Sequence, residues 1–444
     1  MTPKDLANSV IAQLREAGHA AYLVGGCVRD LLLGRVPKDF DVATSAPPDE
    51  LLHLFPQASQ VGAHFGVVLV HDAPVHDGAA HVEIATFRSD LEYLDGRHPE
   101  AVRFETDPRQ DVLRRDFTIN ALLLDPVSGE VLDFIGGQED LKAGIIRAIG
   151  DPALRFQEDH LRLLRGVRFA ARLGFTIEPQ TFAATRLLAP LIGSVSVERV
   201  RDELARILTE GGARRGFELL AATGLLHEVL PEIEAMKGVE QPPQFHPEGD
   251  VWTHTMIMLE GLGATEHAVI SPVLALGVLL HDVGKPGTFR IADRIRFDGH
   301  VEKGVELAHQ LLTRLKFPNQ TIQEVEALVA NHMKFMSVPR MRESTLKRFL
   351  RMERFEDHMA LHRLDCLSSH GALDNYEFVR AKQRELPPEQ LKPPPLLTGH
   401  DLIAAGFRPG PRFGAVLREI EDAQLEGRVS TRAGALELAR IHRP

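Results

Sequence analysis

The stretch YLVGGCVRDLLLGRVPKDFDVAT, residues 22–44, constrains the fold of this chain most strongly. It joins a short apolar run to Gly25-Gly26 and then places two carboxylates, Asp39 and Asp41, one residue apart. A strand would put both carboxylates on one face, close enough to repel each other. A divalent metal ion between them is the favoured way to offset that repulsion. The stretch therefore predicts a strand, a glycine turn and a second strand around a metal-binding face.

The two glycines and the segment after them fit a phosphate-binding turn. Gly26 allows the backbone to approach a phosphate closely, where a side chain would obstruct it. The following residues can begin a helix whose amide N–H groups point at the phosphate, and Arg29 can add a positive charge. Metal ions held by Asp39 and Asp41 would stabilise the attacking and leaving oxygens of an in-line phosphoryl displacement. We therefore expect phosphoryl-displacement chemistry at this turn.

Two further groups of charged residues extend this candidate site, and each has a plainer alternative. Glu83, on a strand predicted at 81–87, can supply a third carboxylate, or can be an exposed charge between apolar neighbours. Arg114, Arg115 and Asp116 can clamp a triphosphate through bidentate contacts, or can form a surface salt-bridge cluster. Both alternatives stay open at this point.

Chain length, apolar runs and cysteine content limit the class of protein. At 444 residues the chain exceeds the size of a single core, so we expect roughly two to four domains. The longest apolar stretch, 272–280, is too short to span a bilayer, and the N-terminus lacks the pattern of a secretory signal. Two cysteines cannot form a disulfide framework, which fits a reducing compartment. We therefore expect a cytoplasmic protein with no membrane partner.

A net charge of −11 argues against indiscriminate nucleic-acid binding but leaves room for a local basic patch. The candidate patch is the segment 339–355. Its basic residues are Arg340, Arg342, Lys347, Arg348, Arg351 and Arg354. On charge alone, a solvated helix face is the favoured interpretation of this segment.

The pattern of predicted elements changes near residue 150. Before it, a helix and several short strands predict a small mixed α/β domain. These elements are a helix at 3–17 and strands at 21–24, 39–43, 66–71, 81–87, 101–104, 119–125 and 130–134. After it, helices dominate, and proline-rich segments at 241–250 and 386–402 are typical of a boundary and a linker. We expect a multidomain α+β protein with a mixed α/β head at 1–150, an all-α neck and body at 151–240, an all-α domain at 241–370 and a helical tail at 371–444.

The strongest predicted helix, 157–174, carries polar residues along one side. At about 100° per residue, Glu158, Arg162 and Arg165 fall within a narrow arc, and Asp159 lies beside it. Apolar residues on the other side would anchor such a helix. It can present a carboxylate and a guanidinium to a pocket, or it can hold only an i,i+4 pair worth about 0.3 kcal/mol.

Three motifs in the same order, GGCVRDLLLG, DFDVAT and RRDFTINAL, make the chain resemble the class II nucleotidyltransferases of the DNA polymerase beta superfamily. That group includes tRNA CCA-adding enzymes, their A-adding and CC-adding relatives and bacterial poly(A) polymerases. The similarity continues through 133–152 and 155–174. It implies a polymerase beta-like palm in the head, with Mg²⁺ held by Asp39 and Asp41 and with Glu83 as a third catalytic carboxylate.

The same resemblance implies how the incoming base is chosen. In the family a Glu-Asp-x-x-Arg motif reads the base, so that protein serves as the template. The match implies that Asp159 and Arg162 read the Watson–Crick edge while Glu158 orients Arg162. Arginine offers donors and aspartate offers acceptors, so the pair can match cytosine or adenine after a small rotation. The nucleotide-binding set implied by the resemblance is Gly25, Gly26, Arg29, Arg114, Arg115, Asp116, Asn120, Glu158, Asp159, Arg162 and Arg165.

The segment 88–107 corresponds to the flexible loop that the family uses to switch from CTP to ATP. Its charged, glycine-containing composition suits a mobile loop. The CC-adding relatives are shortened there and this chain is not, which favours an enzyme that can add A.

A second resemblance, to the HD phosphohydrolase superfamily, rests on VWTHTMIML (251–259) and VLALGVLLHDVGKP (273–286). A helix starting at Ser271-Pro272 and ended by Gly284 and Pro286 would place a His-Asp pair at its C-terminal end. The family pattern implies a set of metal ligands and, for two-metal members, additional histidines. The ligands are His254, His281, Asp282 and Asp365, and the additional histidines are His300 and His332.

The metal implied for this second site is Mn, Ni, Co, Fe or Mg²⁺, with Lys285 beside a substrate phosphate. A hydroxide generated there could hydrolyse phosphomonoesters or 2′,3′-cyclic phosphates at a damaged RNA end. The alternative is a degenerate HD fold kept as a scaffold that holds tRNA.

Together these observations predict a tRNA nucleotidyltransferase that adds or repairs the 3′-terminal CCA from CTP and ATP, with an HD-type phosphohydrolase activity. An A-adding enzyme or a poly(A) polymerase would share the head and neck. A different class of protein, an HD phosphohydrolase with an RNA-binding head, is the other alternative. The tRNA 3′ end is the expected partner, recognised by shape and backbone contacts. The sequence predicts no particular oligomeric state.

Overall fold

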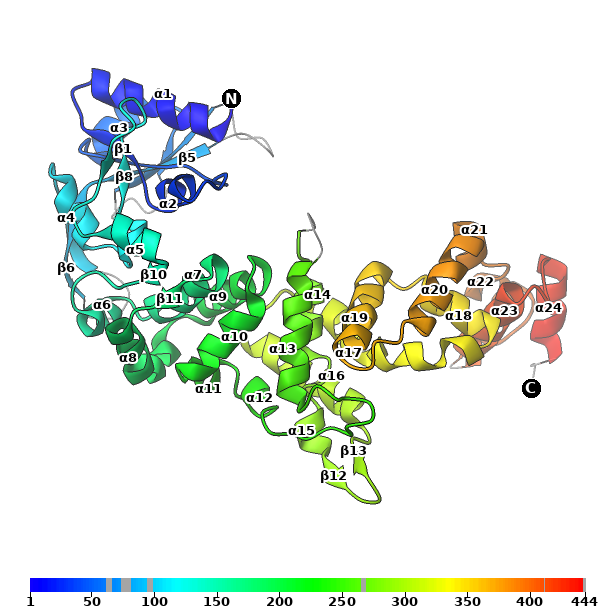
Figure 1. Ribbon diagram of the computed structural model, residues 1–444. Coiled ribbons are helices and arrows are strands. Elements are labelled where there is room, and N and C mark those ends of the chain that lie inside the picture. Colours follow the sequence, from blue (N-terminus) through cyan, green and yellow to red (C-terminus); the bar gives the residue numbers. More distant parts are fainter. Residues whose placement is uncertain (61–65, 73–80, 94–98, 265–268, 411, 442–444) are drawn as a thin grey trace. The chain divides into compact units, whose positions relative to one another are not determined.

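The structure is a computed structural model that describes residues 1–60, 66–72, 81–93, 99–264, 269–410 and 412–441 (Figure 1). The chain divides into two compact units, Met1–Glu234 and Ala235–Pro444. A β-sheet lies in the first unit and helices make up most of the rest, which confirms the predicted multidomain α+β class. The finer division into four domains stays a prediction. Among the described residues, no helix combines the length and the apolar character needed to cross a membrane.

The first unit is built on a seven-stranded mixed sheet with the strand order β3-β4-β5-β2-β1-β8-β9. Its strands are β1 (Ala21–Val24), β2 (Asp41–Thr44), β3 (Ser59–Gln60), β4 (Val67–His71), β5 (His81–Thr86), β8 (Leu123–Leu124) and β9 (Val131–Leu132). β1 runs antiparallel to β2 with Val24 opposite Asp41, and β5 runs parallel to β2 with Glu83 opposite Asp41. This register brings the glycine turn and two of the predicted carboxylates to one end of the sheet.

Helices cover the sheet and continue beyond it. In the first unit they are α1 (Pro3–Glu16), α2 (Gly26–Leu32), α3 (Pro48–Leu54), α4 (Pro108–Leu113), α5 (Gly137–Ala143), α6 (Pro152–Glu158), α7 (Arg162–Leu173), α8 (Pro179–Leu188), α9 (Val197–Thr209), α10 (Ala213–Ala222), α11 (Leu225–Val229) and α12 (Pro231–Glu234), with 3-10 helices η2 (Thr118–Asn120) and η3 (Ala189–Ser194). α1 begins at a Thr2–Asp5 capping box and buries Leu6, Val10 and Leu14. The helix predicted at 3–17 is confirmed.

The single helix predicted at 157–174 is wrong, because the chain leaves the helical conformation at Asp159. Asp159 is extended, with φ −143° and ψ 105°, and separates α6 from α7. Its side chain accepts a hydrogen bond from the Leu161 N–H at 3.1 Å, which offers the backbone an alternative to the helix. The predicted end at Gly174 is confirmed, since this residue takes the left-handed conformation at φ 74°.

Several predicted strands and loops also differ from the structure. Only Leu123–Leu124 of the strand predicted at 119–125 is extended, because hydrogen bonds of the Asn120 side chain to Arg29 and Asp116 hold the tight turn η2. The segment 88–107, matched to the family's flexible loop, contains a hairpin of β6 (Arg88–Tyr93) and β7 (Pro99–Phe104); β7 includes the strand predicted at 101–104, and 94–98 lie outside the described residues. The neck and body expected to be all-α, 151–240, contains the short strand β11 (Thr176–Ile177), which pairs in parallel with β10 (Ile145–Ile146) of the predicted head.

The described residues of the second unit are helical apart from one short hairpin of β12 (Arg290–Ile291) and β13 (Ile295–Arg296), which an all-α prediction omits. Its helices are α13 (Val251–Gly261), α14 (Pro272–Leu280), α15 (Lys285–Thr288), α16 (His300–Arg314), α17 (Asn319–Asn331), α18 (Glu343–Leu350), α19 (Phe355–Ser368), α20 (Asp374–Glu385), α21 (Pro388–Leu391), α22 (Gly399–Ala404), α23 (Arg412–Leu425) and α24 (Arg432–Ile441), with 3-10 helices η4 (Leu262–Ala264) and η5 (His332–Arg340). α14 ends at Leu280 after an N-cap at Ser271, as predicted. α22 to α24 share a small core around Leu402 and Ile420, so the C-terminal segment packs on itself.

Candidate functional site

The glycine turn between β1 and α2 lies against charged side chains. Gly25 has φ 77° and ψ −133°, a conformation that L side chains rarely adopt. A Cβ added at Gly25 would lie 3.6 Å from Arg115 Nη1 and 4.0 Å from Asp41 Oδ2, whereas one at Gly26 would meet only Arg29 Nη2 at 3.6 Å. The steric requirement that the sequence argument places on Gly26 therefore falls on Gly25.

Acidic side chains gather at the start of β2. Asp41 is half-buried and Glu83 lies opposite it on β5, while Asp39 is exposed and precedes the strand. Burial raises the pKa of Asp41 to about 6, and the charges of Glu83 and Asp39 add to this while Arg115 opposes it. A divalent cation would relieve this repulsion, so the donor set fits a metal ion. In the part of the chain that the structure describes, the carboxylate oxygens of these three residues do not all lie within 4.8 Å of one another.

A cavity of about 570 Å³ opens beside this turn and joins most of the predicted nucleotide-binding residues. It is lined by Gly25, Gly26, Arg29, Asp41, Arg88, Asp90, Arg114, Arg115, Asp116, Asn120, Asp159, Arg162, Arg165, Arg168, Phe169, Arg172 and Arg206. Glu158, Asp39 and Glu83 are the predicted site residues of this unit outside that lining. Nine arginines face four aspartates, and this excess of positive charge suits a triphosphate.

One buried carboxylate, Asp111, holds both arginines of the predicted clamp. Asp111 Oδ1 accepts from Arg114 Nε at 2.9 Å and Nη2 at 2.5 Å, and Oδ2 accepts from Arg115 Nε at 3.1 Å and Nη2 at 2.7 Å. Burial would raise the pKa of Asp111, but Arg115 and Arg114 outweigh it and hold the pKa below its ordinary value. The sequence argument missed Asp111, although its i,i+3 and i,i+4 spacing to the two arginines was a usable signal.

Asp116 links the tight turn η2 to helix α7. Its Oδ2 accepts from Arg165 Nε at 2.9 Å and Nη2 at 2.7 Å, and its Oδ1 accepts from Asn120 Nδ2 at 3.2 Å. Asn120 Oδ1 in turn accepts from Arg29 Nη1 at 2.6 Å. Arg29 is buried and also donates twice to Asp30, so its guanidinium is largely engaged within the protein. These residues form the frame of the cavity as well as part of its wall.

Replacing Asp116 with Asn is expected to lower the free energy of unfolding by about 2 kcal/mol at pH 7. Burial would raise the pKa of Asp116, but Arg165 outweighs it and lowers the pKa to about 2. A depressed pKa stabilises the fold above the unfolded value near ~4 and loses that contribution as the pH falls toward 2. Urea unfolding at pH 7 and pH 3 checks this, since the difference between variant and wild type should shrink at the lower pH. Asp202→Asn, at an exposed carboxylate of the same unit, is the matched control.

The two residues predicted to read the base are each held by a neighbour. Asp159 accepts from Arg199 Nη2 at 3.1 Å and 3.3 Å, and Arg162 Nη1 donates to Glu158 Oε2 at 2.7 Å. Arg162 Nη2 also donates to the carbonyl of Arg114 at 3.0 Å. The orienting contact between Glu158 and Arg162 thus forms as the prediction requires. Arg199 was missed because α9 reaches Asp159 through the tertiary fold, and nothing in the local spacing marks it.

Four histidines of the second unit turn the same ring atom toward two aspartates. Nδ1 of His281, His300 and His332 contacts the backbone carbonyls three residues earlier at 2.8, 2.9 and 2.7 Å. A carbonyl only accepts, so Nδ1 carries the proton and Nε2 presents a lone pair. Nδ1 of His254 contacts Glu248 Oε1 at 2.7 Å; burial lowers the pKa of His254, but the carboxylates of Asp365 and Glu248 outweigh it and raise that pKa to about 9.

In each of these four histidines, Nε2 faces a carboxylate oxygen. Nε2 of His254 lies 3.2 Å from Asp365 Oδ1, and Nε2 of His281 lies 3.1 Å from Asp282 Oδ2. The Nε2 atoms of His300 and His332 lie 3.9 Å and 3.8 Å from Asp282 Oδ1. None of the four Nε2 atoms has an aligned hydrogen-bond partner among the described residues. A buried set of acceptors without donors fits one or two metal ions, and the structure brings all six predicted ligands of this site together.

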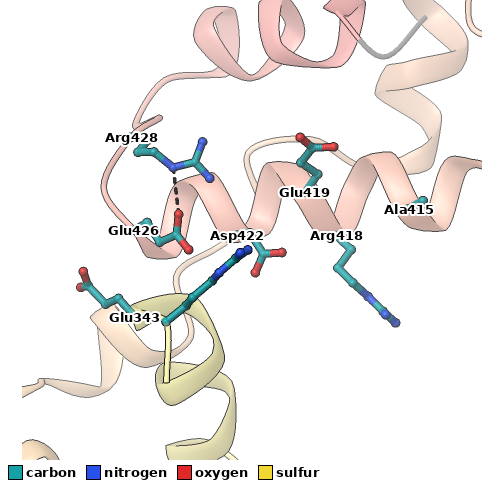
Figure 2. Close-up of a pocket in the computed structure, with 8 residues that line it drawn as sticks. Glu343, Ala415, Arg418, Glu419, Asp422, Glu426 and Arg428 are labelled. Carbon is teal, nitrogen blue, oxygen red and sulfur yellow. Dashed lines mark hydrogen bonds and ion pairs between the residues drawn. The ribbon is translucent and has the colours of Figure 1, made fainter. Parts of the chain in front are cut away.

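The basic segment 339–355 is largely engaged in internal ion pairs. Arg348 contacts Glu421 and Asp422, Arg351 contacts Glu421, and the buried Lys347 donates to the carbonyl of Leu425 at 2.6 Å. Figure 2 shows the adjoining pocket, which is lined by Glu419 and Asp422 of α23 and Glu343 of α18, and in which Arg428 pairs with Glu426. These contacts hold α18, which lies within the segment, against α23. Most of the positive charge of the segment is therefore not available to RNA.

Comparisons with known proteins agree with a nucleotide-binding site in the first unit. The profile of the poly(A) polymerase head domain matches residues 21–147, that of a probable RNA- and SrmB-binding site of polymerase A matches 174–237, and that of a putative second domain of tRNA nucleotidyltransferases matches 301–439.

Whole-chain similarity extends this agreement. A CCA-adding enzyme of Levilactobacillus brevis is 34% identical over 437 residues, which cover 98% of this chain and 97% of the relative. The CCA-adding enzyme of Geobacillus stearothermophilus is 44% identical over 223 residues, 50% of this chain and 54% of the relative. The crystal structure of the Bacillus stearothermophilus CCA-adding enzyme in complex with CTP matches with a TM-score of 0.74 at 29% identity, covering 100% of this chain and 99% of that one. The chain therefore belongs to the family of CCA-adding enzymes, the tRNA nucleotidyltransferases expected from its motifs.

Proposed function

We propose that the first unit adds C, C and A to the 3′ end of tRNA, using CTP and ATP without a nucleic-acid template. One observation carries this proposal. A single cavity joins the glycine turn, Asp41 and the pair Asp159–Arg162, so a triphosphate and a base can be held in one place. A tRNA substrate also implies a cytoplasmic location, in line with two buried free cysteines.

In the proposed reaction the terminal 3′-hydroxyl of the RNA attacks the α-phosphate of the nucleotide. A new phosphodiester bond forms, the bond to the β-phosphate breaks and pyrophosphate leaves. Gly25 leaves room for the phosphates, Arg114 and Arg115 neutralise their charge, and Asp41 with Asp39 would hold Mg²⁺. Mg²⁺ supplies a lowered pKa for the hydroxyl and charge neutralisation for the triphosphate.

Base selection is proposed for Asp159 and Arg162. Arg162 donates and Asp159 accepts, and both line the same cavity as Arg115. The ion pairs to Arg199 and Glu158 hold the two side chains in place before the base arrives. Preorganised polar groups discriminate strongly, because a wrong base leaves them unpaired.

The decisive experiment offers the protein three tRNA transcripts, ending before CCA, after C and after CC. Each is incubated with Mg²⁺ and labelled CTP, ATP or both, and the products are sized to one nucleotide. Ordered addition of C, C and A that then stops supports the proposal. A single A added only to the CC-ended transcript would identify an A-adding enzyme, and long A tails would identify a poly(A) polymerase.

A second candidate function belongs to the second unit, and the four inward-facing histidine Nε2 atoms favour it. We propose that His254, His281, Asp282 and Asp365 bind a divalent metal such as Mn, Ni, Co, Fe or Mg, and that His300 and His332 bind a second ion. In the proposed reaction, water adds to the phosphorus of a phosphomonoester or a 2′,3′-cyclic phosphate and one ester P–O bond breaks. Lys285, whose Nζ lies 2.6 Å from Asp282 Oδ2, would stand beside the phosphate.

Replacing Asp282 with Asn is expected to remove metal from the second unit and to lower phosphatase activity by about 10²-fold or more. Asp282 is the carboxylate shared by two of the candidate ligand groups, so both metal positions depend on it. Metal content measured by mass spectrometry after loading with Mn²⁺ or Ni²⁺, together with p-nitrophenyl phosphate hydrolysis, checks this. Glu306→Gln, at an exposed carboxylate of α16 paired with Lys303 and outside the lining of this cavity, is the control and should retain both properties. A scaffold-only role would be indicated if the wild-type protein takes up no metal.

A further inference from the structure

We propose that Phe169 is a positioning residue of the nucleotide cavity, whose ring face holds three guanidinium groups in place for the phosphates of the incoming nucleotide. The inference rests on the nucleotidyl transfer proposed for the first unit. It deepens that proposal by naming the group that arranges one positively charged wall of the cavity. The role falls to an aromatic side chain that carries no charge and takes no part in the reaction itself.

Three arginines gather around the ring of Phe169. The guanidinium carbon of Arg168 lies 4.3 Å from the ring centroid, and those of Arg165 and Arg29 each lie 5.3 Å from it. A cation within about 6 Å of the centroid is attracted by the negative face of the ring. Arg165 and Arg168 share α7 with Phe169, but Arg29 comes from α2, so helical spacing alone does not produce this arginine cluster.

A second aromatic ring fixes the orientation of Phe169. Phe169 is buried and packs edge to face with the fully buried Phe117, with ring centroids 5.9 Å apart and an interplanar angle of 81°. This is a favoured geometry for two aromatic rings. A Cβ added at Gly166 would lie 3.1 Å from Phe117, so α7 packs tightly against this ring. The face of Phe169 is therefore a rigid surface on which guanidinium groups can rest.

Carboxylates hold the members of the arginine cluster one by one. The acceptor oxygens are Asp30 Oδ1 at 2.7 Å from Arg29 Nη2, Asp116 Oδ2 at 2.7 Å from Arg165 Nη2 and Glu203 Oε2 at 2.6 Å from Arg168 Nε. They come from α2, from the segment before η2 and from α9, and among the described residues none of them pairs with the whole cluster. The ring of Phe169 is common to all three guanidinium groups.

The arginine cluster and the ring all line the nucleotide cavity. Like charges so close together repel each other, and burial strengthens the repulsion. The negative face of Phe169 offsets part of it and so keeps the guanidinium groups from turning away. Charged groups that are fixed before the ligand arrives bind it at a lower entropic cost. A weaker ring face should therefore lower the affinity for the triphosphate and leave the choice of base unchanged.

The test changes the charge of the ring face with little change in its shape. Site-specific incorporation replaces Phe169 with phenylalanines that carry one, two or three fluorine atoms on the ring, because fluorine withdraws electrons from the face. Binding of CTP, ATP and inorganic triphosphate to the full chain with Mg²⁺ is measured by calorimetry, and incorporation into tRNA by steady-state kinetics. The trifluorinated residue at Phe217, a buried side chain of α10 outside the cavity lining, is the matched control.

We expect the logarithm of Kd for CTP, ATP and inorganic triphosphate to rise in step with the number of fluorine atoms, reaching about tenfold weaker binding with three. KM for both nucleotides should rise in the same proportion, while the ratio of C to A incorporation stays constant. Phe169→Leu, which removes the ring, should bind no more tightly than the trifluorinated protein. The control at Phe217 should bind all three ligands as the wild type does.

Lower thermal stability along the series with unchanged triphosphate affinity would overturn the positioning role, because the ring would then serve only the fold. Weaker binding of CTP and ATP with unchanged binding of inorganic triphosphate would also overturn it, because the ring would then contact the base. Fluorine-dependent binding by a protein that incorporates no nucleotide into tRNA keeps the role of Phe169 and overturns the proposed transfer. Incorporation that does not depend on fluorine keeps the transfer and overturns the role, and a wild type that binds no nucleotide overturns both.

Discussion

Replacing Asp41 with Asn is expected to lower nucleotide incorporation into a CC-ended tRNA by about 10³-fold or more, with Mg²⁺ and ATP at saturation. Asp41 lies where β2 begins, lines the nucleotide cavity and carries a pKa raised to about 6 by burial, with Glu83 adding to the effect. This marks it as the carboxylate that depends most on a bound cation. Loss of a preorganised group at the reacting phosphate typically costs about 10²–10³-fold, and loss of a metal ligand costs more.

The control for this prediction is Asp49→Asn, at an exposed carboxylate in the first turn of α3. It should incorporate nucleotides at the wild-type rate. Hydrolysis of p-nitrophenyl phosphate should be unchanged in Asp41→Asn, because that activity is proposed for the other unit. Near-normal incorporation by Asp41→Asn would contradict the metal-binding assignment, and loss of phosphatase alone would favour the HD-centred alternative.

Replacing Gly25 with Ala is expected to lower incorporation by about 10²-fold while the fold survives. Two effects combine. The residue has φ 77°, which strains any L side chain by about 1–2 kcal/mol. The new methyl would also stand 3.6 Å from Arg115 and 4.0 Å from Asp41, in the space proposed for phosphate. Steady-state kinetics should show a raised KM for both CTP and ATP, because both share the triphosphate.

Gly34→Ala separates these two effects. Gly34 also has a positive φ, 69°, but a Cβ there would meet nothing within 4 Å. It should lower thermal stability by a similar amount and leave KM unchanged. If both variants lose activity to the same extent, backbone strain alone explains the result and the phosphate cradle is not supported.

The sequence predicted the elements whose signals are local. The strand before Gly25, the capped helix α1 and the end of α14 at a His-Asp pair all follow from short-range patterns of apolar residues, caps and glycines. The predicted elements that the structure contradicts involve contacts with residues far away in the sequence. At the break, Asp159 contacts Arg199 from α9 in addition to the nearby Leu161 N–H, and the tight turn at Asn120 is held in part by Arg29 from α2.

The residues of the candidate site show the same contrast between those inside the quoted motifs and those outside them. Motif resemblance gave the residues around the cavity, and the structure brings nearly all of them together. It did not give Asp111 or Arg199, which lie outside the quoted motifs and act by holding motif residues in place. The predicted basic patch around Arg348 shows the converse error, since charge density alone does not reveal acidic partners on α23.

The break at Asp159 has a consequence for how such enzymes diversify. Because this residue leaves the helix, the acceptor and the donor of the proposed base-reading pair have separate tethers, Arg199 for Asp159 and Glu158 for Arg162. A mutation at one tether can shift one hydrogen bond and leave the other in place. An enzyme that accepts two bases can then become specific for one base through changes at Arg199 or Glu158, while its catalytic carboxylates stay unchanged. The two ion pairs thus allow the acceptor and the donor of the proposed base-reading pair to change independently of each other.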